Sequence, residues 1–148
     1  MSYLLKNSSQ VVSTLENTAR SIKENVNNHF KDLQFEISYE QWEVIQAIND
    51  NQGLTQIEIA KKCCKEPASI SRTLKFLKKK DLIQKVKDRK NKRNNRIFLT
   101  DKGKVLSMNA KSCFENVSKL GLDNIFDREV NMLIKLLERI QHNYGAVA

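Results

Sequence analysis

The sequence predicts a mainly α-helical protein that carries one small β-hairpin. Three observations support this fold class. The chain of 148 residues contains one Pro and four Gly, so it offers few of the breaks that a turn-rich β fold needs. Apolar residues recur at spacings of three and four over most of its length, which is the helical pattern. After Asp81 the spacing changes to the period of two that is typical of strands.

The length and the apolar fraction of 40% suit one domain with a core of ordinary size, and we expect a single domain over residues 1–148. No run of about 18 apolar residues could span a bilayer, and the N-terminus lacks the apolar run of a signal peptide. Three cysteines, an odd number, do not form a disulfide framework and fit a reducing compartment. The sequence therefore predicts a cytoplasmic protein without a membrane partner.

Amphipathic helices are expected at both ends, over about residues 5–33 and 104–144. The apolar stripe of the first is Val12, Leu15, Ala19, Ile22 and Val26. Gly121 separates the last two, whose stripes are Leu106, Ala110, Cys113, Val117 and Leu120, then Phe126, Val130, Leu133, Leu137, Ile140 and Tyr144. These stripes exceed what the middle of the chain needs for its own core, so we expect them to join two subunits. An ordinary intrachain core is the alternative.

Two capping boxes mark helix starts in the middle of the chain. In such a box, a hydroxyl and a carboxamide or carboxylate three residues later satisfy each other's backbone amides. The pairs are Ser38 with Gln41, flanked by Ile37 and Trp42, and Thr55 with Glu58, flanked by Leu54 and Ile59. The flanking apolar residues are placed to form hydrophobic staples, so both positions predict helix N-termini.

Pro67 opens a further expected helix, since proline is tolerated in a first turn. Ile70, Leu74 and Leu77 would face the core. The opposite face presents Ser69, Arg72, Lys75 and Lys79. Two helices joined by the short stretch around residues 63–66 predict a helix-turn-helix, whose second helix needs small residues for close approach, donors for base edges and cations for phosphates. The alternative is a plain surface helix that happens to carry these residues.

The period of two after Asp81 predicts two short strands around a tip from Asp88 to Asn95. This tip contains three Asn together with Arg89, Lys90, Lys92 and Arg93. A hairpin directly after the second helix of a helix-turn-helix is a wing, whose cations would reach phosphates or an adjacent minor groove. We therefore expect a winged helix-turn-helix over about residues 38–101.

The positive charge of the chain is concentrated in one block. Residues 61–104 contain 17 Lys and Arg against 4 Asp and Glu, whereas the remainder contains 9 against 13. A cationic block on a mildly acidic body is expected where a polyanion docks, because neutralised phosphates release their counterions. A solvated lysine-rich face is the alternative.

No pattern indicates an enzyme. The chain has two histidines, His29 and His142, no Gly-rich phosphate loop, and no Cys/His or paired-carboxylate arrangement with a recognisable spacing. We therefore expect no catalytic residues, no metal and no cofactor.

The order of elements and the local motifs resemble the MarR family of bacterial transcriptional regulators. The resemblance extends from about Leu5 to Tyr144. It is strongest in three stretches: Ser38 through Trp42 to Ile48, Ser69 to Arg72 followed by Leu74 and Leu77, and Ile97 to Gly103. It implies a winged helix-turn-helix with N- and C-terminal dimerisation helices. It also implies a sequence-specific regulator, usually a repressor, that binds double-stranded DNA as a homodimer on a near-palindromic operator and responds to a small-molecule effector.

The resemblance also assigns roles to residues. Ser69, Ser71, Arg72 and Lys75 would read the major groove, and Arg93 would enter the minor groove. By their charge, Arg89, Lys90, Lys92 and Arg96 of the hairpin complete the expected DNA-binding set. The family usually has Asp where this chain has Asn91, and often has Gly where it has Asp81, a residue that tolerates left-handed backbone better than most. An effector pocket would lie between the dimerisation helices and the winged helix, with Tyr39 and Trp42 as candidate lining residues.

Two other functions remain open. A nucleoid-type protein that binds DNA without sequence preference would show the same basic block. A thiol-based redox sensor would use Cys63, Cys64 or Cys113, and nearby lysines could lower the pKa of the adjacent pair. In related peroxide sensors the reactive cysteine lies in the N-terminal helical region, where the first 62 residues of this chain contain none.

Overall fold

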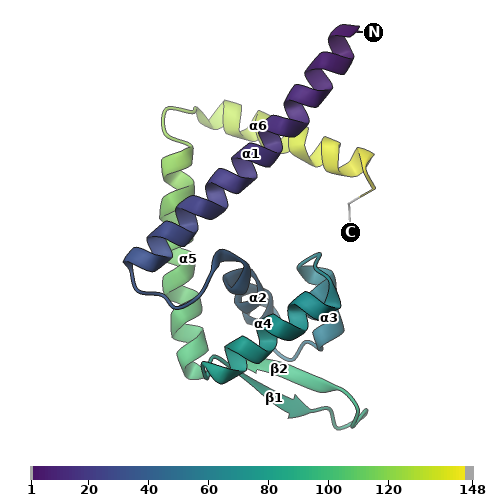
Figure 1. Ribbon diagram of the computed structural model, residues 1–148, viewed down its shortest axis with the longest axis vertical. Coiled ribbons are helices and arrows are strands. Elements are labelled where there is room, and N and C mark those ends of the chain that lie inside the picture. The colour runs from purple at the N-terminus through teal and green to yellow at the C-terminus, as the bar shows by residue number, and fades with distance from the viewer. Residues whose placement is uncertain (1, 146–148) are drawn as a thin grey trace. The chain divides into compact units, whose positions relative to one another are not determined.

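The computed structural model describes the backbone of residues 2–145 and the side chains of residues 7–145. Within this range it contains six helices and one antiparallel hairpin, which confirms the predicted fold class (Figure 1). The elements are α1 (Ser2–Asp32), α2 (Tyr39–Asp50), α3 (Gln56–Lys62), α4 (Pro67–Lys79), β1 (Ile83–Lys87), β2 (Asn95–Leu99), α5 (Asp101–Gly121) and α6 (Asp127–Asn143). The chain divides into two compact units, Met1–Val117 and Ser118–Ala148.

Both predicted capping boxes are present. The Ser38 amide donates to Gln41 Oε1 at 2.9 Å, and the Gln41 amide donates to Ser38 Oγ at 3.2 Å. The Thr55 amide donates to Glu58 Oε2 at 2.7 Å, and the Glu58 amide donates to Thr55 Oγ1 at 3.3 Å. Pro67 is the first residue of α4, as the sequence predicts. Local chemistry therefore fixes where α2, α3 and α4 begin.

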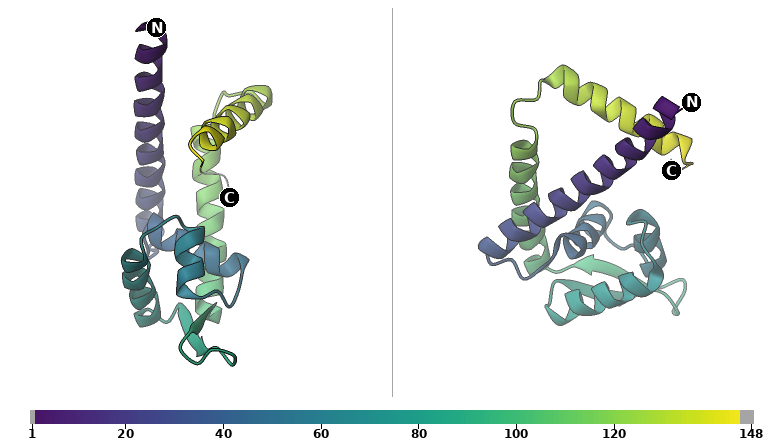
Figure 2. Two further views of the ribbon diagram at one scale, coloured as in Figure 1. Left: turned by 90° about the vertical axis from the view of Figure 1, so that its right-hand side faces the viewer. Right: turned by 45° about the horizontal axis from the view of Figure 1, so that its top comes forward.

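The hairpin projects from the helical body of the first unit (Figure 2). Its register runs from Ile83 opposite Leu99 to Lys87 opposite Asn95. Asn95 thus belongs to β2 and not to the tip, so the tip is one residue shorter than the sequence predicts. The alternation of apolar residues locates the start of β2 only approximately, because the first residues of this strand are exposed and polar.

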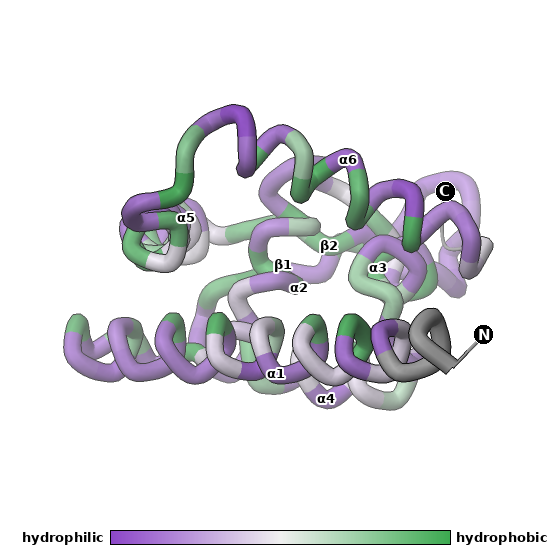
Figure 3. Tube along the Cα trace, turned by 90° about the horizontal axis from the view of Figure 1, so that it is seen from above, coloured by the Kyte–Doolittle hydropathy of each residue, from purple (hydrophilic) through white to green (hydrophobic). Residues whose placement is uncertain are grey.

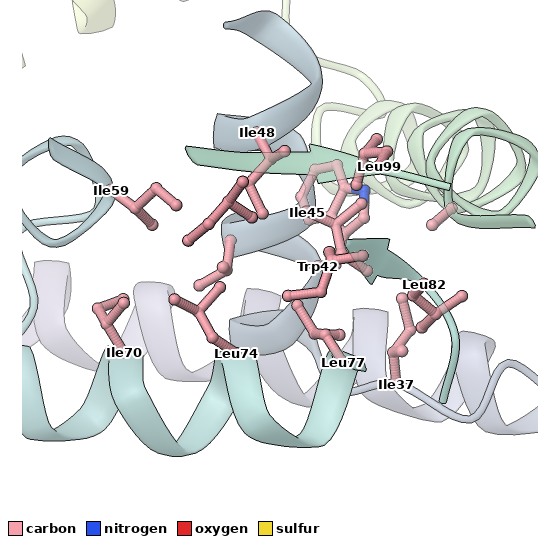
Figure 4. Packing of buried hydrophobic residues seen from close by; sticks show 14 of the residues in the cluster. Ile37, Trp42, Ile45, Ile48, Ile59, Ile70, Leu74, Leu77, Leu82 and Leu99 are labelled. Carbon is pink, nitrogen blue, oxygen red and sulfur yellow. The ribbon is translucent and has the colours of Figure 1, made fainter. Parts of the chain in front are cut away.

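The core of the first unit lies between α2, α3, α4 and β2 (Figure 4). Ile70, Leu74 and Leu77 of α4 are fully buried, which confirms the predicted inner face of this helix. They pack into one cluster with Val44, Ile45 and Ile48 of α2, Ile59 of α3, and Ile97 and Leu99 of β2. Full burial of such side chains contributes about 1.5–3 kcal/mol each, so the orientation of α4 is strongly fixed.

The turn after α4 depends on two special backbone positions. Asp81 has φ +59°, which is the left-handed conformation. Glycine adopts this conformation readily, and the resembled family often has Gly at this position. A Cβ on Gly103 of α5 would lie 2.1 Å from the carbonyl oxygen of Leu82, so no larger residue fits there. The Thr100 hydroxyl also donates to the Asp81 carbonyl at 2.7 Å. The start of α5 is therefore locked against the end of α4.

Hydrophobic residues recur along the terminal helices (Figure 3). The predicted stripe of α5 is mostly buried, because Ala110, Cys113 and Val117 pack in the intrachain core. The stripes of α1 and α6 stay partly exposed. In α1, Val26 is fully buried, whereas Val12 and Ile22 are each 43% exposed. In α6 no residue is buried, and Leu133 and Leu136 are each 44% exposed. Among residues 2–145, no helix combines the length and hydropathy that a membrane span requires.

Candidate nucleic-acid interface

Helix α4 presents a polar face opposite its buried one. Ser71, Arg72 and Lys75 are exposed, and Ser69 is half-buried. These are the four residues that the sequence assigns to reading a DNA groove, and the structure brings them onto the outer side of one helix. Small hydroxyls alternate there with cations, so a polyanion can approach the helix closely while ammonium and guanidinium groups reach its phosphates. Their contact with DNA stays a prediction.

The turn that sets α4 against α3 is held by backbone and side-chain bonds. Cys64 adopts φ +50° in this turn, and the Lys65 amide donates to the Ala60 carbonyl at 3.1 Å. Lys65 Nζ lies 3.1 Å from Glu43 Oε2, which ties the turn to α2. The lysine side chain is 20% exposed, so this ion pair is better shielded than a typical surface pair. The helix-turn-helix is therefore held at its turn as well as by its core.

Hydrogen bonds within the chain hold the wing tip. The Asp88 amide donates to the Asn94 carbonyl, and the Asn94 amide donates to the Asn91 carbonyl, both at 2.9 Å. Asn91 Oδ1 accepts the Arg93 amide at 3.2 Å. Asn91 thus holds the backbone of Arg93, although it stands where the family usually has aspartate. The cations of this tip are exposed: Arg89, Lys90, Lys92 and Arg93.

Arg96 differs from the other predicted wing contacts, because its guanidinium has two partners within the chain. Nη1 donates to the Gly53 carbonyl at 2.9 Å, and Nη2 lies 3.2 Å from Asp88 Oδ2. The Lys90 amide, and after it the charge of Arg96, hold the pKa of the Asp88 carboxyl below its ordinary value. Sequence reasoning did not identify Gly53 or Asp88 as supports of the wing. The sequence did contain one signal of such a support, because Asp88 is the one acidic residue among the cations of the hairpin.

A notch of about 260 Å³ lies where α3, α4 and the wing meet. Arg93 lines it from the wing side, and Pro67 lines it at the N-terminus of α4. The remaining lining residues are Thr55, Gln56, Ile57, Lys85, Asn94, Asn95 and Ile97. The helix-turn-helix and the wing therefore form one continuous surface, with hydrogen-bonding side chains along it.

Tyr39 and Trp42, the candidate effector contacts, lie in an aromatic cluster. The Trp42 ring centroid is 4.6 Å from that of Phe114, 5.8 Å from that of Tyr39 and 6.3 Å from that of Phe30. Trp42 is only 6% exposed, and its Nε1 has no hydrogen-bond partner among the described residues. Burial, with a smaller effect of Glu43, raises the pKa of Tyr39. Trp42 belongs to the core, and a ligand role for either residue stays a prediction.

A larger cavity, of about 560 Å³, lies beside this cluster. Its apolar lining is Phe35, Ile37, Leu82, Val105 and Leu106, and its polar lining is Gln34, Glu36, Lys80, Asp101, Lys102 and Asn109. These residues come from the α1–α2 linker, the end of α4 and the first turns of α5. Neither Tyr39 nor Trp42 lines the cavity.

The three cysteines occupy different environments. Cys113 is buried, and burial raises its pKa. Cys63 is half-buried, and burial together with Glu43 raises its pKa. Only Cys64 is exposed. A raised pKa lowers the thiolate fraction, so the surroundings of Cys63 and Cys113 work against redox reactivity. Within the described part of the chain, no group of three His, Cys, Asp or Glu side chains could hold a metal ion.

Comparison with known proteins shows what this winged helix is similar to. Residues 37–94 match the MarR family model. The winged helix-turn-helix of this chain is similar to the MarR family. This match confirms, for the winged helix-turn-helix, the resemblance that the motif stretches indicate. The predicted winged helix-turn-helix fold is confirmed, and the function as a transcriptional regulator stays a prediction.

Relatives of this chain match it over most of its length. YybA of Bacillus subtilis (strain 168), an uncharacterised HTH-type transcriptional regulator, is 27% identical over 125 residues, covering 84% of this chain and 82% of YybA. A SlyA-like transcription regulator from Listeria monocytogenes has a TM-score of 0.81 at 26% identity, covering 89% of this chain and 87% of its own. A mutant MarR from E. coli complexed with operator DNA shares the fold, with a TM-score of 0.82 at 18% identity over 88% and 93% of the two chains.

Proposed function

We propose that this protein is a MarR-family regulator that binds double-stranded DNA, with α4 in the major groove and the wing along the backbone and the adjacent minor groove. The observation that carries the proposal is the outer face of α4, where exposed Ser71, Arg72 and Lys75 lie opposite a fully buried apolar face. Beside α4 lies a wing tip whose exposed cations provide attraction for phosphates. The E. coli MarR whose fold it shares was solved with operator DNA.

The DNA-binding surface has one part that reads sequence and another that anchors the protein to phosphates. Ser69, Ser71, Arg72 and Lys75 contact base edges and the phosphates next to them, because short side chains let the helix approach the groove. Lys90 and Lys92 contact phosphates, and Arg93 enters the minor groove. The regulator represses transcription by occupying its operator.

The regulator acts as a homodimer. Support comes from the apolar side chains that α1 and α6 leave exposed: Val11, Val12 and Ile22 in α1, and Met132, Leu133, Ile134 and Leu136 in α6. A second copy of the chain would remove these side chains from water, at about 25 cal/mol per Å² of apolar area. A two-fold dimer presents two copies of α4, so the operator is a near-palindrome with half-sites about 10 base pairs apart.

A small molecule modulates the regulator through the cavity of about 560 Å³. This volume falls within the range of about 300–1,000 Å³ that small-molecule sites occupy. Five apolar side chains line it beside the amines of Lys80 and Lys102. The ligand class that fits is a compact apolar, for example aromatic, body with one carboxylate. Such a ligand would compete with Glu36 for the Lys80 ammonium, because the two now form an ion pair.

The test of DNA binding compares a duplex selected from genomic fragments with random competitor at fixed salt. A specific regulator binds the selected duplex about 10³-fold or more tightly than the competitor, whereas a nucleoid-type protein binds both alike. Sedimentation equilibrium at micromolar concentration tests the dimer, and a monomer there would contradict it. Thiol-specific oxidation that changes DNA affinity would instead support the redox alternative.

A further inference from the structure

Arg96 joins two parts of the winged helix that are far apart in the sequence. Its Nη1 atom donates to the carbonyl oxygen of Gly53 at 2.9 Å, and its Nη2 atom lies 3.2 Å from Asp88 Oδ2. Gly53 belongs to the loop between α2 and α3, and Asp88 begins the wing tip. One planar guanidinium, with its donors in a fixed fork, therefore connects the body of the winged helix to its wing.

Asp88 is placed for this contact at an electrostatic cost. It is the one acidic residue between Ile83 and Thr100, a segment with seven Lys and Arg. A carboxylate there repels an approaching polyanion. Its side chain is nevertheless only 13% exposed, and its Oδ1 accepts the Lys90 amide at 3.0 Å. The carboxylate thus bonds both the tip and Arg96.

Gly53, at the other end of the connection, is also held in place by its surroundings. Gly53 has φ +89°, and a Cβ at this position would lie 3.1 Å from the Phe98 ring. Both the backbone conformation and the close Phe98 ring therefore disfavour any other residue here. The Gly53 amide donates to the Ile97 carbonyl, and the Ile97 amide donates to the Leu54 carbonyl, both at 2.9 Å. The carbonyl that accepts Arg96 therefore belongs to a loop that β2 already holds.

We propose that Asp88, Arg96 and Gly53 form a clamp that sets the position of the wing for DNA binding. This inference rests on the proposed DNA-binding function. It makes Arg96 a positioning residue, in place of the DNA contact that the sequence predicts. The clamp keeps the tip cations in one place relative to α4, so breaking it lowers the fraction of molecules in which both elements can engage one duplex.

The Asp88→Asn variant tests the clamp by whether it strengthens or weakens DNA binding. Electrostatics alone predicts tighter DNA binding, because a negative charge leaves a basic surface. The clamp predicts weaker binding: if the fraction of docked wings falls to about a quarter, the apparent Kd rises about fourfold. The matched control is Glu66→Gln. Glu66 is an exposed acid at the N-cap of α4 whose side chain makes no capping bond, so its neutralisation should tighten binding or leave it unchanged.

Two variants of Arg96 separate positioning from phosphate contact. Arg96→Lys keeps the charge but loses the fork, so it should weaken binding as Asp88→Asn does. The matched control is Arg139→Lys at an exposed position of α6, outside the proposed DNA-binding surface, which should leave binding unchanged. Arg96→Ala should weaken binding with an unchanged dependence on salt. If Arg96 contacted a phosphate, its loss would lower the salt slope by about one unit.

Hydrogen exchange in the free protein gives a reading that needs no DNA. Arg96→Lys should speed exchange of the Gly53 and Asp88 amides, while Arg89→Lys leaves them unchanged. Tighter binding by Asp88→Asn, or a reduced salt slope for Arg96→Ala, would overturn the clamp, as would unchanged exchange in Arg96→Lys. If the wild-type chain binds no duplex, the proposed function fails, and hydrogen exchange still decides whether Arg96 holds the wing.

Discussion

Glu36 and Lys80 form an ion pair, with 2.8 Å between Glu36 Oε2 and Lys80 Nζ. Glu36 lies in the linker between α1 and α2, and Lys80 is the C-cap of α4. The Lys102 ammonium donates to the Lys80 carbonyl at 3.0 Å, so the same turn also bonds α5. Both partners of the ion pair line the cavity. The end of the proposed recognition helix is thereby tied to the segment that leads to α1.

The first prediction concerns acid stability. The Lys80 hydrogen bond and charge lower the pKa of Glu36 from 4.5, and the Thr55 bonds do the same for Glu58. A carboxyl with a lowered folded-state pKa contributes stability above its unfolded pKa, and this contribution is lost as the pH falls through the folded value. At pH values below about 4.5, we expect the urea concentration at the unfolding midpoint to decrease. This decrease should be smaller in Glu36→Gln.

Glu58→Gln is the companion variant, because glutamine keeps the capping box while removing the titration. It should leave the midpoint near neutral pH almost unchanged and reduce the acid loss. Chemical denaturation followed by Trp42 fluorescence at several pH values measures both variants. An acid loss that is identical in wild type and both variants would contradict these pKa directions.

The second prediction concerns reading by α4. Arg72→Ala should cost about 1–3 kcal/mol on the selected duplex, because a base-edge or adjacent phosphate contact is lost. Binding to scrambled DNA should change less. The control is Arg128→Ala, which removes an arginine of α6, in the other compact unit. Equal weakening on both duplexes would show that Arg72 does not read sequence.

The third prediction concerns anchoring by the wing. Lys90→Ala or Lys92→Ala should weaken binding to all sequences alike and lower the salt slope by about one unit each. Arg93→Ala should in addition reduce the preference for A·T-rich flanks, where a narrow minor groove attracts arginine. Affinity measured against salt on selected and scrambled duplexes separates these effects. A salt slope that stays at the wild-type value would exclude phosphate contacts by these lysines.

The fourth prediction concerns the cavity. Saturating aromatic carboxylates should change DNA affinity in the wild type. Val105→Trp, which fills the cavity from a residue that is 55% exposed, should remove this response. Met108→Trp adds the same side chain to α5 at an exposed residue that does not line the cavity, so it should keep the response. Wild-type affinity that ignores the acids would exclude this ligand class.

The fifth prediction concerns assembly. Ile22→Glu in α1 or Leu133→Glu in α6 should shift the homodimer toward monomer, because each places a charge in an exposed apolar stripe. Asn28→Glu adds the same charge to an exposed polar position of α1 and should leave the dimer intact. Sedimentation equilibrium measures the shift. Unchanged association in both stripe variants would place the dimer contact elsewhere.

Local sequence determined much of this fold. The helix starts at Ser38 and Thr55 follow from groups three residues apart, so the segment alone encodes them. The buried face of α4 follows from the spacing of Ile70, Leu74 and Leu77, since helical periodicity decides which residues share a face. The basic face opposite it follows from the same geometry. These features depend on separations of one or two helical turns.

Tertiary structure decided the features that join distant segments. Arg96 meets Gly53 across 43 residues, and Lys80 meets Glu36 across 44. The sequence assigned Arg96 to DNA because charge alone does not reveal which partner a guanidinium has. The cavity likewise lies apart from the aromatic residues Tyr39 and Trp42, since its walls come from three segments that only the packed core brings together. Periodicity and caps are encoded within single elements, whereas ion pairs and cavities depend on where those elements finally pack.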